Sequence, residues 1–486
     1  MASSNSLRGG ADGNQDFDVV IIGAGWSGLG TAQTLISKGV SNFLVLEASD
    51  TIGGRCQNVT LNDGMTAELG CQWIHGASTQ NPVYNIVKSS GISTIESDFD
   101  DIALYSNVYG GSGPHRVWNV PETDYNGFVS FQTKLQDSTN VDQPLRKTAD
   151  TYIKNKNLKG DARIRFEYLL DTYIVQEYAA SLQDLSLWWN EDSVINNIDH
   201  MIGQGAGKGY SGILDYYATP FADRVRYNSL VTSINWSSTS NVVVTYSNSG
   251  STTNVNAKKV IVTVPLGVLQ KGSINFTPAL PSWKSNAINK LGVGTYNKVI
   301  LQWNDDVTLP WPDVEWLEKI AKLGDQGRWT EFFNMKPTTG KQVLVAFSAG
   351  RESERMETLS DASIQYEIIH SLEDMFGVST IPTPVHVVIT RWKANKLSNG
   401  SYSYYKVGSK PQHLITRWKA NKLSNGSYSY YKVGSKPQHR KDLGAAIGKR
   451  VFFAGEACHL KYPSTTHGAL MSGQDTAFAV VNELGK

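Results

Sequence analysis

The Gly23–Gly28 segment restricts this chain most, because its glycine spacing follows an apolar strand and opens a helix. In a dinucleotide-binding βαβ unit, Gly23 permits a tight turn, Gly25 lets the backbone approach the pyrophosphate and Gly28 lets the helix pack closely on the strand. The free N–H groups of the helix N-terminus then bind phosphate. Glu47 ends the next strand, where a carboxylate can bind ribose hydroxyls. The segment therefore predicts a bound dinucleotide with a free 2′-hydroxyl, and NADP is disfavoured.

The same strand and helix patterns recur in the middle and at the end of the chain. Further buried strands are predicted at Phe43–Glu47, Lys258–Pro265 and Val451–Glu456. Helices are predicted at Asp161–Tyr178, Asp361–Phe376 and 467–484. The predicted fold class is α/β combined with α+β, in which a discontinuous Rossmann-like cofactor domain carries an inserted substrate-binding domain. We expect that inserted domain to be a mixed β-sheet flanked by helices.

The domain boundaries follow from this pattern. We expect a flexible tail at 1–15, a cofactor domain at 16–85, 204–285 and 442–486, and a substrate-binding domain at 86–203 and 286–441.

Composition and charge exclude several classes of partner. The chain has 486 residues, of which 40% are hydrophobic and 18% charged, so it fits two or three globular domains. The formal net charge of +1 supplies no overall field for nucleic acid or an acidic membrane. The sequence has no run of about 18 apolar residues, so we expect no membrane span. A monomer that binds neither nucleic acid nor membrane is the expected state.

The cysteines and the chain ends bear on the compartment. Cys56, Cys71 and Cys458 are far apart, lack metal-ligand spacing and form a poor disulfide framework, which suits a reducing compartment. The first 15 residues are small and polar, unlike a secretory signal, and the C-terminal ELGK is not a peroxisomal signal. We therefore expect a cytoplasmic protein, while a secreted form stays open.

A perfect repeat interrupts the second half of the chain. The 25-residue segment ITRWKANKLSNGSYSYYKVGSKPQH occurs at 389–413 and again at 415–439, with an offset of 26 residues. Solenoid repeats come in three or more copies that drift in sequence. We therefore interpret the pair as a recent tandem duplication or a sequence-assembly error. The strand predicted at Val385–Trp392 runs unbroken into the first copy.

Five further segments carry a resemblance to a known family. They are Gly53-Gly54-Arg55, ELGCQWIHG (Glu68–Gly76), TVPLGVLQ (Thr263–Gln270), YNKVILQW (Tyr296–Trp303) and FAGEACHLKYPSTTHGALMSG (Phe453–Gly473). With the glycine turn, they resemble the flavin-containing amine oxidase family, and its polyamine oxidase and spermine oxidase branch most closely, from Asp18 to Leu484. The resemblance implies that the dinucleotide is a non-covalently bound FAD.

The resemblance also implies which residues contact FAD. Gly54 and Arg55 match the glycine and arginine that lie under the pyrophosphate and ribityl chain in the family. Glu456 matches a family acid at the cofactor, and Val231 matches a residue whose backbone contacts the adenine. Read alone, Arg55 also fits a surface ion pair. The full expected set is Gly23, Gly25, Gly28, Glu47, Gly54, Arg55, Trp73, Val231, Trp392, Glu456 and Thr466.

A second group of residues is expected to handle the amine. Lys298 matches a family lysine that holds a water against flavin N5, and His75 lies where relatives place a histidine or glutamate near the substrate nitrogen. A buried lysine has a lowered pKa and histidine titrates near neutrality, so both can move a proton. Read alone, Lys298 also fits a solvated strand-end lysine and His75 a structural histidine. The expected substrate-binding residues are Glu177, which reaches toward a distal amine, Tyr428, Thr465 and Tyr296.

The duplication offers two candidates for the aromatic residue that faces the flavin. Tyr402 and Tyr428 are the same residue in the two copies, 54 and 28 residues before Glu456, and the shorter spacing is closer to that of the family. We therefore expect Trp392 from the first copy and Tyr428 from the second. The remaining residues would loop out, and closing such a loop costs about 1–2 kcal/mol.

The expected activity is that of an FAD-dependent polyamine oxidase with O2 as electron acceptor. As the resemblance implies, a hydride passes to flavin from the carbon beside a secondary amine of spermine, spermidine or their acetylated forms. The products would be an aminoaldehyde, a shorter amine and H2O2.

Alternative functions stay open at this point. A monoamine or L-amino-acid oxidase is the alternative enzyme, although no cysteine lies between Cys71 and Cys458 to tether FAD as in the monoamine group. A histone-demethylase relative would need a helical module and a long coiled insertion, for which the chain lacks heptads. An FAD-binding homologue inactivated by the duplication is the non-enzyme alternative.

Overall fold

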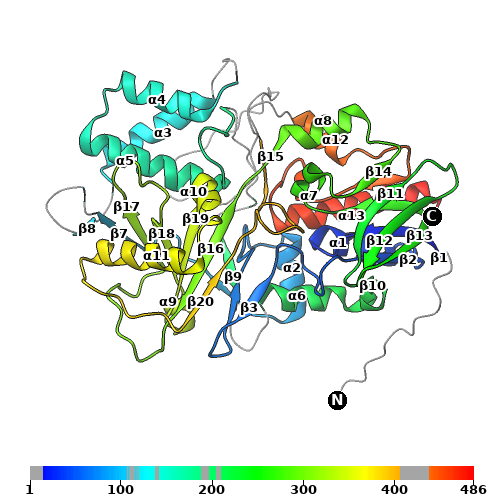
Figure 1. Cartoon of the computed structure of the whole chain (residues 1–486), viewed down its shortest axis with the longest axis horizontal. Helices are drawn as coiled ribbons and strands as arrows, with labels where there is room; N and C mark the ends of the chain where they lie inside the picture. The colour runs from blue at the N-terminus through cyan, green and yellow to red at the C-terminus, as the bar shows by residue number, and fades with distance from the viewer. Residues whose placement is uncertain are drawn as a thin grey trace.

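In the described part of the chain, two large β-sheets form the two halves of the molecule (Figure 1). The computed structural model describes residues 15–106, 108, 115–117, 120–136, 142–187, 195, 198–203, 209–405 and 437–486. Within these ranges, no helix has both the length and the apolar character needed to cross a bilayer. The same residues contain no cluster of three or more side chains suited to hold a metal ion.

The first sheet draws its strands from three distant parts of the chain, and eight of them lie in the described residues. These are β1 (Gln15–Ile22), β2 (Phe43–Leu46), β10 (Val225–Arg226), β11 (Leu230–Asn235), β12 (Val242–Asn248), β13 (Ser251–Val262), β14 (Asn275–Thr277) and β22 (Val451–Phe453). The order is β10-β2-β1-β13-β12-β11-β14, and β22 also pairs with β13. Because β1 runs parallel to β2, with Val19 opposite Phe43, the predicted βαβ unit is confirmed.

Two long helices cover one face of this sheet. They are α1 (Trp26–Ser37), which follows β1, and α13 (Thr466–Glu483), near the C-terminus. Their backbones approach closely at Gly473, where a Cβ would lie 2.0 Å from Ser27 O. The Thr31 hydroxyl donates to Gly473 O at 3.1 Å across the same contact. Leu29 of α1 and Leu470 of α13 lie in one apolar core with strand β1. This packing fixes the N-terminus of α1 at the carboxyl end of β1.

The second sheet is mixed, with seven strands among the described residues. In spatial order they are β20 (His386–Ile389), β16 (Tyr296–Gln302), β19 (Val343–Ala349), β18 (Glu331–Asn334), β17 (Trp316–Ile320), β7 (Ile102–Ser106) and β8 (His115–Val117). Helix α11 (Asp361–Phe376) has its predicted bounds, and the Ser360 side chain caps it by accepting from Ser363 N. Ile364, Ile368 and Leu372 of α11 lie in one apolar core with β16 and β19. A mixed sheet flanked by helices is therefore present, while the exact domain boundaries stay a prediction.

The remaining elements connect the two sheets or cover them (Figure 1). The helices are α2 (Pro82–Ser90), α3 (Glu122–Gln136), α4 (Leu145–Asn155), α5 (Gly160–Leu170), α6 (Gly209–Ala218), α7 (Leu266–Lys271), α8 (Ser282–Lys290), α9 (Lys336–Thr339), α10 (Gly350–Met356) and α12 (Pro437–Gly444). The short strands are β3 (Asn58–Thr60), β4 (Thr66–Glu68), β5 (Trp73–Ile74), β6 (Thr94–Glu96), β9 (His200–Ile202), β15 (Leu291–Val293) and β21 (Ser403–Tyr405). Figure 1 shows β3, β9 and β15 between the two large sheets.

Several predicted elements differ from those observed. The strand predicted at Val385–Trp392 spans only His386–Ile389, and the strand predicted at Lys258–Pro265 spans Ser251–Val262. The strand predicted at Val451–Glu456 ends at Phe453, because Gly455 turns the chain with a φ of 142°. The helix predicted at Asp161–Tyr178 divides, since α5 continues as a π-helical turn over Asp171–Gln176. Such turns occur frequently at functional sites, and this one leads directly into a cavity wall.

Candidate functional site

A long cavity extends from the first sheet toward the second. Its volume is about 1950 Å³, with its opening to solvent included. Gly28 lies behind its wall, within α1. The predicted site residues that line it are Gly23, Gly25, Glu47, Gly54, Arg55, Trp73, His75, Val231, Tyr296, Lys298, Trp392, Glu456, Thr465 and Thr466.

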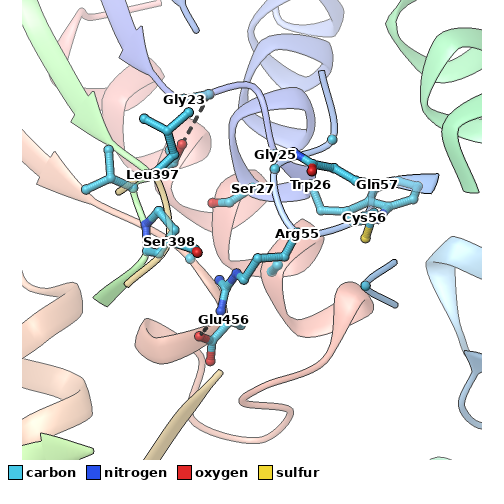
Figure 2. Close-up of a pocket in the computed structure, with 18 of the residues that line it drawn as sticks. Gly23, Gly25, Trp26, Ser27, Arg55, Cys56, Gln57, Leu397, Ser398 and Glu456 are labelled. Atoms are coloured by element: carbon cyan, nitrogen blue, oxygen red, sulfur yellow. Dashed lines mark hydrogen bonds and ion pairs between the residues drawn. The ribbon is translucent and has the colours of Figure 1, made fainter. Parts of the chain in front are cut away.

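The turn between β1 and α1 has the properties of a phosphate-binding site (Figure 2). Gly23 has a φ of 102°, and its N–H donates to Leu46 O at 2.8 Å. A Cβ on Gly28 would lie 1.9 Å from Gly23 O, so only glycine fits there. Among the described residues, no side chain caps the N-terminus of α1 and the buried Ser27 hydroxyl has no hydrogen-bond partner. These unused donors, at the positive end of a helix, suit an anionic pyrophosphate.

Glu47 occupies the cavity wall at the end of β2. Its buried carboxylate accepts from Ala24 N at 2.6 Å and from Ser49 N at 2.9 Å. These bonds fix the side chain in the same wall as Val231, which is buried in β11. A fixed acceptor beside the glycine turn suits ribose hydroxyls.

An ion pair between Arg55 and Glu456 links distant segments in the cavity wall (Figure 2). Arg55 Nη1 lies 3.0 Å from Glu456 Oε1 and also donates to Ser401 O at 2.7 Å. Glu456 accepts from Ser403 Oγ at 2.7 Å. Burial alone would raise the pKa of Glu456, but Arg55, the Ser403 hydroxyl and Arg440 together hold it below its usual value. Arg55 therefore forms its ion pair inside the site and not on the outer surface.

Lys298 lines the cavity from β16 and is buried, unlike a solvated strand-end lysine. Its Nζ donates to Glu68 O at 3.1 Å, Gly70 O at 2.8 Å and Gln72 Oε1 at 2.8 Å. Burial lowers the pKa of Lys298 and raises the pKa of the nearby Glu68 carboxyl, while their mutual attraction opposes both shifts. Sequence reasoning missed Glu68 and Gln72 as partners, although both lie in the segment that carried the family resemblance.

His75 follows β5 and is oriented by a distant carboxylate. Its Nδ1 lies 2.8 Å from Asp199 Oδ2, and Asp199 Oδ1 accepts from Gly76 N at 2.9 Å. Asp199 therefore orients the His75 ring through Nδ1. Asp199 carried no recognisable sequence signal, because it is 124 residues from its partner.

A second cavity adjoins the first, and both have Trp73, His75 and Tyr296 in their walls. Glu177 lines this second cavity and directly follows the π-helical turn. The other residues of its wall are Phe99, Thr172, Gln176, Trp316, Glu318 and Glu331.

Thr465 and Thr466 begin α13 at the edge of the first cavity. The Thr465 hydroxyl accepts from Gly468 N at 2.9 Å and donates to Tyr462 O at 2.9 Å. Thr465 therefore caps the helix, a structural use that its sequence context did not reveal.

The first copy of the repeat supplies a large part of the cavity wall. Trp392 is buried, and its indole N–H donates to Leu69 O at 3.3 Å. Residues 395–398 also line the cavity, and Figure 2 shows Leu397 and Ser398 near the Gly23 turn. No motif had marked these residues of the first copy.

The tyrosine next to Tyr296 is Tyr402, from the same copy. The two ring centroids are 6.5 Å apart, and the Tyr402 hydroxyl donates to Glu177 O at 3.1 Å. Strand β21 begins at the next residue and pairs with β15, which holds Tyr402 in place. Tyr428, the tyrosine expected here, lies outside the described residues. Within the described residues, this part of the wall comes from the first copy, and the expectation for Tyr428 stays a prediction.

The structure contradicts the expectation drawn from the cysteines. Cys56 and Cys71 form a disulfide, with Cα atoms 5.1 Å apart, and both line the first cavity. The β3–β4 hairpin lies between them and brings them together, with Asn58 opposite Glu68. Cys458 is free, and burial raises the pKa of its thiol to about 12. The cysteines no longer favour a reducing compartment, and cytoplasmic localisation stays a prediction.

Comparison with known proteins assigns the class of this fold and site. The family described as flavin-containing amine oxidoreductase matches residues 26–414 and 408–481. Over 474 residues the chain is 28% identical to probable polyamine oxidase 4 of Arabidopsis thaliana, which covers 95% of this chain and 86% of that relative. It is 27% identical over 500 residues to polyamine oxidase 1 of Zea mays, with coverage of 96% and 90%.

Two other relatives show how far the likeness extends. The chain is 30% identical over 491 residues to lysine-specific histone demethylase 1 homolog 1 of Arabidopsis thaliana, covering 96% of this chain but 52% of that protein. The fold resembles the solved structure of wild-type putrescine oxidase bound to putrescine, with a TM-score of 0.71. That alignment covers 97% of this chain and 100% of the other at 19% identity, so it bears on the fold alone.

The fold and the cavity define an FAD-dependent amine oxidase. The chain belongs to the flavin-containing amine oxidoreductase family, in its polyamine oxidase branch. The unused donors around Ser27 and the fixed Glu47 carboxylate fit the pyrophosphate and ribose of FAD. Non-covalent binding fits the cavity as well, since its two cysteines are joined to each other.

Proposed function

We propose that this enzyme oxidises polyamines at a carbon beside a secondary amine and uses O2 as the electron acceptor. The substrates would be spermine, spermidine or their acetylated forms, and the products an aminoaldehyde, a shorter amine and H2O2. The observation that carries the proposal is that two cavities have Trp73, His75 and Tyr296 in common in their walls. One cavity holds the predicted cofactor residues and Lys298, and the other is walled by carboxylates and aromatic rings.

The proposed roles at the cofactor follow from the cavity wall. The α1 N-terminus and Ser27 would bind the pyrophosphate, Glu47 the ribose and Arg55 the central part of the cofactor. When bound, FAD accepts the hydride from the substrate carbon. Trp392 would cover the ring system and help to exclude water from it.

Lys298 and His75 are the proposed proton-handling residues. The lowered pKa of Lys298 lets its Nζ lose and regain a proton near neutral pH, so it can hold a water and move a proton through it. His75 Nε2 would accept a proton from the substrate ammonium, because only the neutral amine releases hydride readily. Tyr296 and Tyr402 would pack against the amine, and Thr465 would support the wall from its helix cap.

The same observations weigh against the alternatives. A monoamine has no second ammonium group to face the carboxylates of the second cavity. A polyamine substrate is therefore favoured over a monoamine. The inactivated-homologue reading assumed that the duplication disrupts the site. In the described chain, however, Trp392 and Tyr402 of the first copy both line the first cavity.

Product analysis tests the proposal. Purified wild-type protein should be yellow, and spermine should bleach its flavin absorbance without O2. Release of spermidine and 3-aminopropanal would support oxidation on the outer side of the nitrogen, as the histidine at position 75 suggests, whereas 1,3-diaminopropane would indicate the inner side. A yellow protein that no polyamine bleaches would refute the proposed function. Size-exclusion chromatography checks the predicted monomer.

A further inference from the structure

A buried arginine beside the cofactor cavity takes no part in the proposed reaction. Arg440 belongs to α12, and none of its surface is exposed to solvent. It lies behind the wall of the first cavity and does not line it. A buried charge destabilises the fold unless it is paired and hydrogen-bonded. The groups that Arg440 contacts therefore show which part of the molecule depends on it.

Arg440 binds the two segments that surround the Glu456 carboxylate. Its Nη1 donates to Ser403 Oγ at 3.1 Å and to Ala457 O at 3.0 Å. Ser403 begins β21, and Ala457 follows Glu456 in the same short turn. Both partners are themselves buried. The arginine thus joins α12 to the strand and to the turn that hold this carboxylate.

The bond from Arg440 determines which way the Ser403 hydroxyl points. A guanidinium group has only donors and no acceptor, so Ser403 Oγ must accept from it. The hydroxyl proton is then available to Glu456 Oε2, which lies 2.7 Å away. Ser464 N donates to the same oxygen at 3.0 Å. Arg440 therefore keeps Ser403 as a donor toward Glu456.

The other oxygen of Glu456 holds Arg55 in the cavity wall (Figure 2). Glu456 Oε1 lies 3.0 Å from Arg55 Nη1, and an ionised carboxylate is needed for both oxygens to accept in this way. Burial raises the pKa of Glu456, while Arg55, the Ser403 hydroxyl and Arg440 lower it. Loss of Arg440 removes both its charge and the fixed direction of the Ser403 hydroxyl. Glu456 would then take up a proton at a higher pH, and the ion pair with Arg55 would be lost.

The place of Arg440 in the sequence gives it a role that its counterpart after the first copy of the repeat cannot fill. Arg440 directly follows the second copy, and Leu414 stands at the same position after the first. A leucine side chain has no hydrogen-bond donor. Ser403 belongs to the first copy, so its bond to Arg440 joins that copy to the segment beyond the second.

We propose that Arg440 is a positioning residue for FAD binding, which directs the Ser403 hydroxyl onto Glu456 and so holds Arg55 at the cofactor site. Arg440 acts from behind the wall, through Ser403 and Glu456. By keeping Glu456 ionised, it extends tight FAD binding to mildly acidic pH. This role goes beyond the proposed oxidation of polyamines, since it concerns the cofactor and holds whichever amine reacts.

Other titratable groups of the described chain lie near Glu456 and Arg440. Burial raises the pKa of the Cys458 thiol to about 12 and lowers that of His459 to about 4, so neither changes charge between about pH 5.5 and about pH 8. Burial lowers the pKa of Lys284 to about 7, and its Nζ donates to backbone carbonyls of α12. Lys284 therefore titrates in this range, and its effect has to be separated from that of Glu456.

The test measures how tightly variants retain FAD as pH falls. Arg440→Met removes the charge and the donors, Ser403→Ala removes the hydroxyl, and Arg440→Lys keeps a charged donor. Lys441→Met is the matched control, because Lys441 is the exposed neighbour of Arg440 in the same helix. Each holoenzyme is dialysed to equilibrium with FAD at about pH 8 and at about pH 5.5, and its dissociation constant is divided by that of wild type.

For Arg440→Met we expect this ratio to rise about 10-fold between the higher and the lower pH, since Glu456 gains a proton and Arg55 loses its partner. Ser403→Ala should show a smaller rise in the same direction. Arg440→Lys should restore a ratio near that of wild type, and Lys441→Met should match wild type at both pH values. In a Glu456→Gln background, Arg440→Met should produce no pH-dependent change, although Lys284 is still present.

Thermal melting without FAD separates positioning from a loss of packing. In Arg440→Met the folded protein would keep a proton on Glu456 that the unfolded chain loses from about pH 4.5 upward, so its free energy of unfolding relative to wild type falls as pH rises. The stability deficit should therefore be largest at about pH 8, whereas the deficit in FAD affinity should be largest at about pH 5.5.

Three results would overturn the role of Arg440. They are a ratio that does not change with pH, a ratio that decreases as pH falls, and a rise that persists in the Glu456→Gln background. If Arg440→Met does not fold, the ratio for Ser403→Ala decides in the same way. None of these measurements needs an amine to be oxidised, so failure of the proposed function would leave them interpretable.

Discussion

A substitution at Gly25, in the turn between β1 and α1, can weaken FAD binding without disturbing folding. Gly25 is the N-cap of α1, with φ −78° and ψ −179°, a conformation that any L-residue can adopt. The nearest heavy atom to a Cβ at this position is Gly53 O, 3.9 Å away, so alanine fits the protein without FAD. The Cβ would nevertheless extend from the cavity wall, where the backbone must approach the pyrophosphate.

The expected effect of Gly25→Ala on the protein without FAD is close to zero. Alanine reduces the entropy of the unfolded chain and stabilises by about 0.4–1 kcal/mol. Alanine is also a poorer N-cap than glycine, which offsets that gain. With FAD the balance differs, because each lost hydrogen bond from the backbone to a charged phosphate costs about 1.5–3 kcal/mol. FAD affinity should therefore fall about 10- to 100-fold per bond lost.

The assay is thermal melting with and without FAD, combined with titration of FAD fluorescence. At about 100 times its dissociation constant, FAD stabilises wild type by about 2.7 kcal/mol. Gly25→Ala should melt like wild type without FAD and keep only about 0.4–1.4 kcal/mol of that gain at the same FAD concentration. Gly28→Ala is the contrast, since its Cβ would lie 1.9 Å from Gly23 O and should lower Tm even without FAD. Wild-type FAD affinity in Gly25→Ala would refute the placement of the pyrophosphate.

Other features of the site and core give further expected outcomes. Tyr402→Phe loses the hydrogen bond to the Glu177 carbonyl and should lower kcat/KM for spermine about 10-fold. Tyr428→Phe should match wild type. The reverse result would assign this part of the site to the second copy. Because of the Cys56–Cys71 disulfide, titration of denatured, unreduced protein should find one thiol, and three would contradict it. Burial raises the pKa of Asp171 to about 7. Between about pH 4 and pH 7 the folded protein therefore keeps a proton on Asp171 that the unfolded chain has lost. The free energy of unfolding falls as pH rises through this range. Asp171→Asn should therefore raise Tm more at about pH 8 than at about pH 5, and a gain independent of pH would contradict the assigned cause.

The features that the sequence predicted well depend on neighbouring residues. The βαβ unit follows from apolar runs and from glycines whose steric role is local, such as Gly28 against Gly23 O. The α11 helix has its predicted bounds, because Ser360 caps it at one end and Gly377 takes a left-handed conformation at the other. These signals act within a few residues, so tertiary packing has little chance to override them.

The partners of the reactive residues could not be read from the sequence. Asp199 reaches His75 across 124 residues, and Lys298 reaches Gln72 across 226. The Cys56–Cys71 disulfide depends on a hairpin that brings the two cysteines together. Such contacts are set by how sheets and connections pack, and a spacing rule along the chain does not contain that information. The same holds for Arg440 and Ser403, which are 37 residues apart and become partners only through the packing of α12.

The identity of the two copies leaves open, from sequence alone, which of them forms the site. The two copies have the same local preferences, so the connections and contacts at their ends decide which one forms the site. Trp392 lies three residues after the end of β20, and only the first copy is joined to that strand. The same copy then bonds to both members of the Arg55–Glu456 pair, through Ser401 and Ser403. Deletion of residues 389–414 and deletion of residues 414–439 yield the same amino-acid sequence, so such a deletion variant cannot tell the copies apart. Only a substitution confined to one copy can assign the cavity wall.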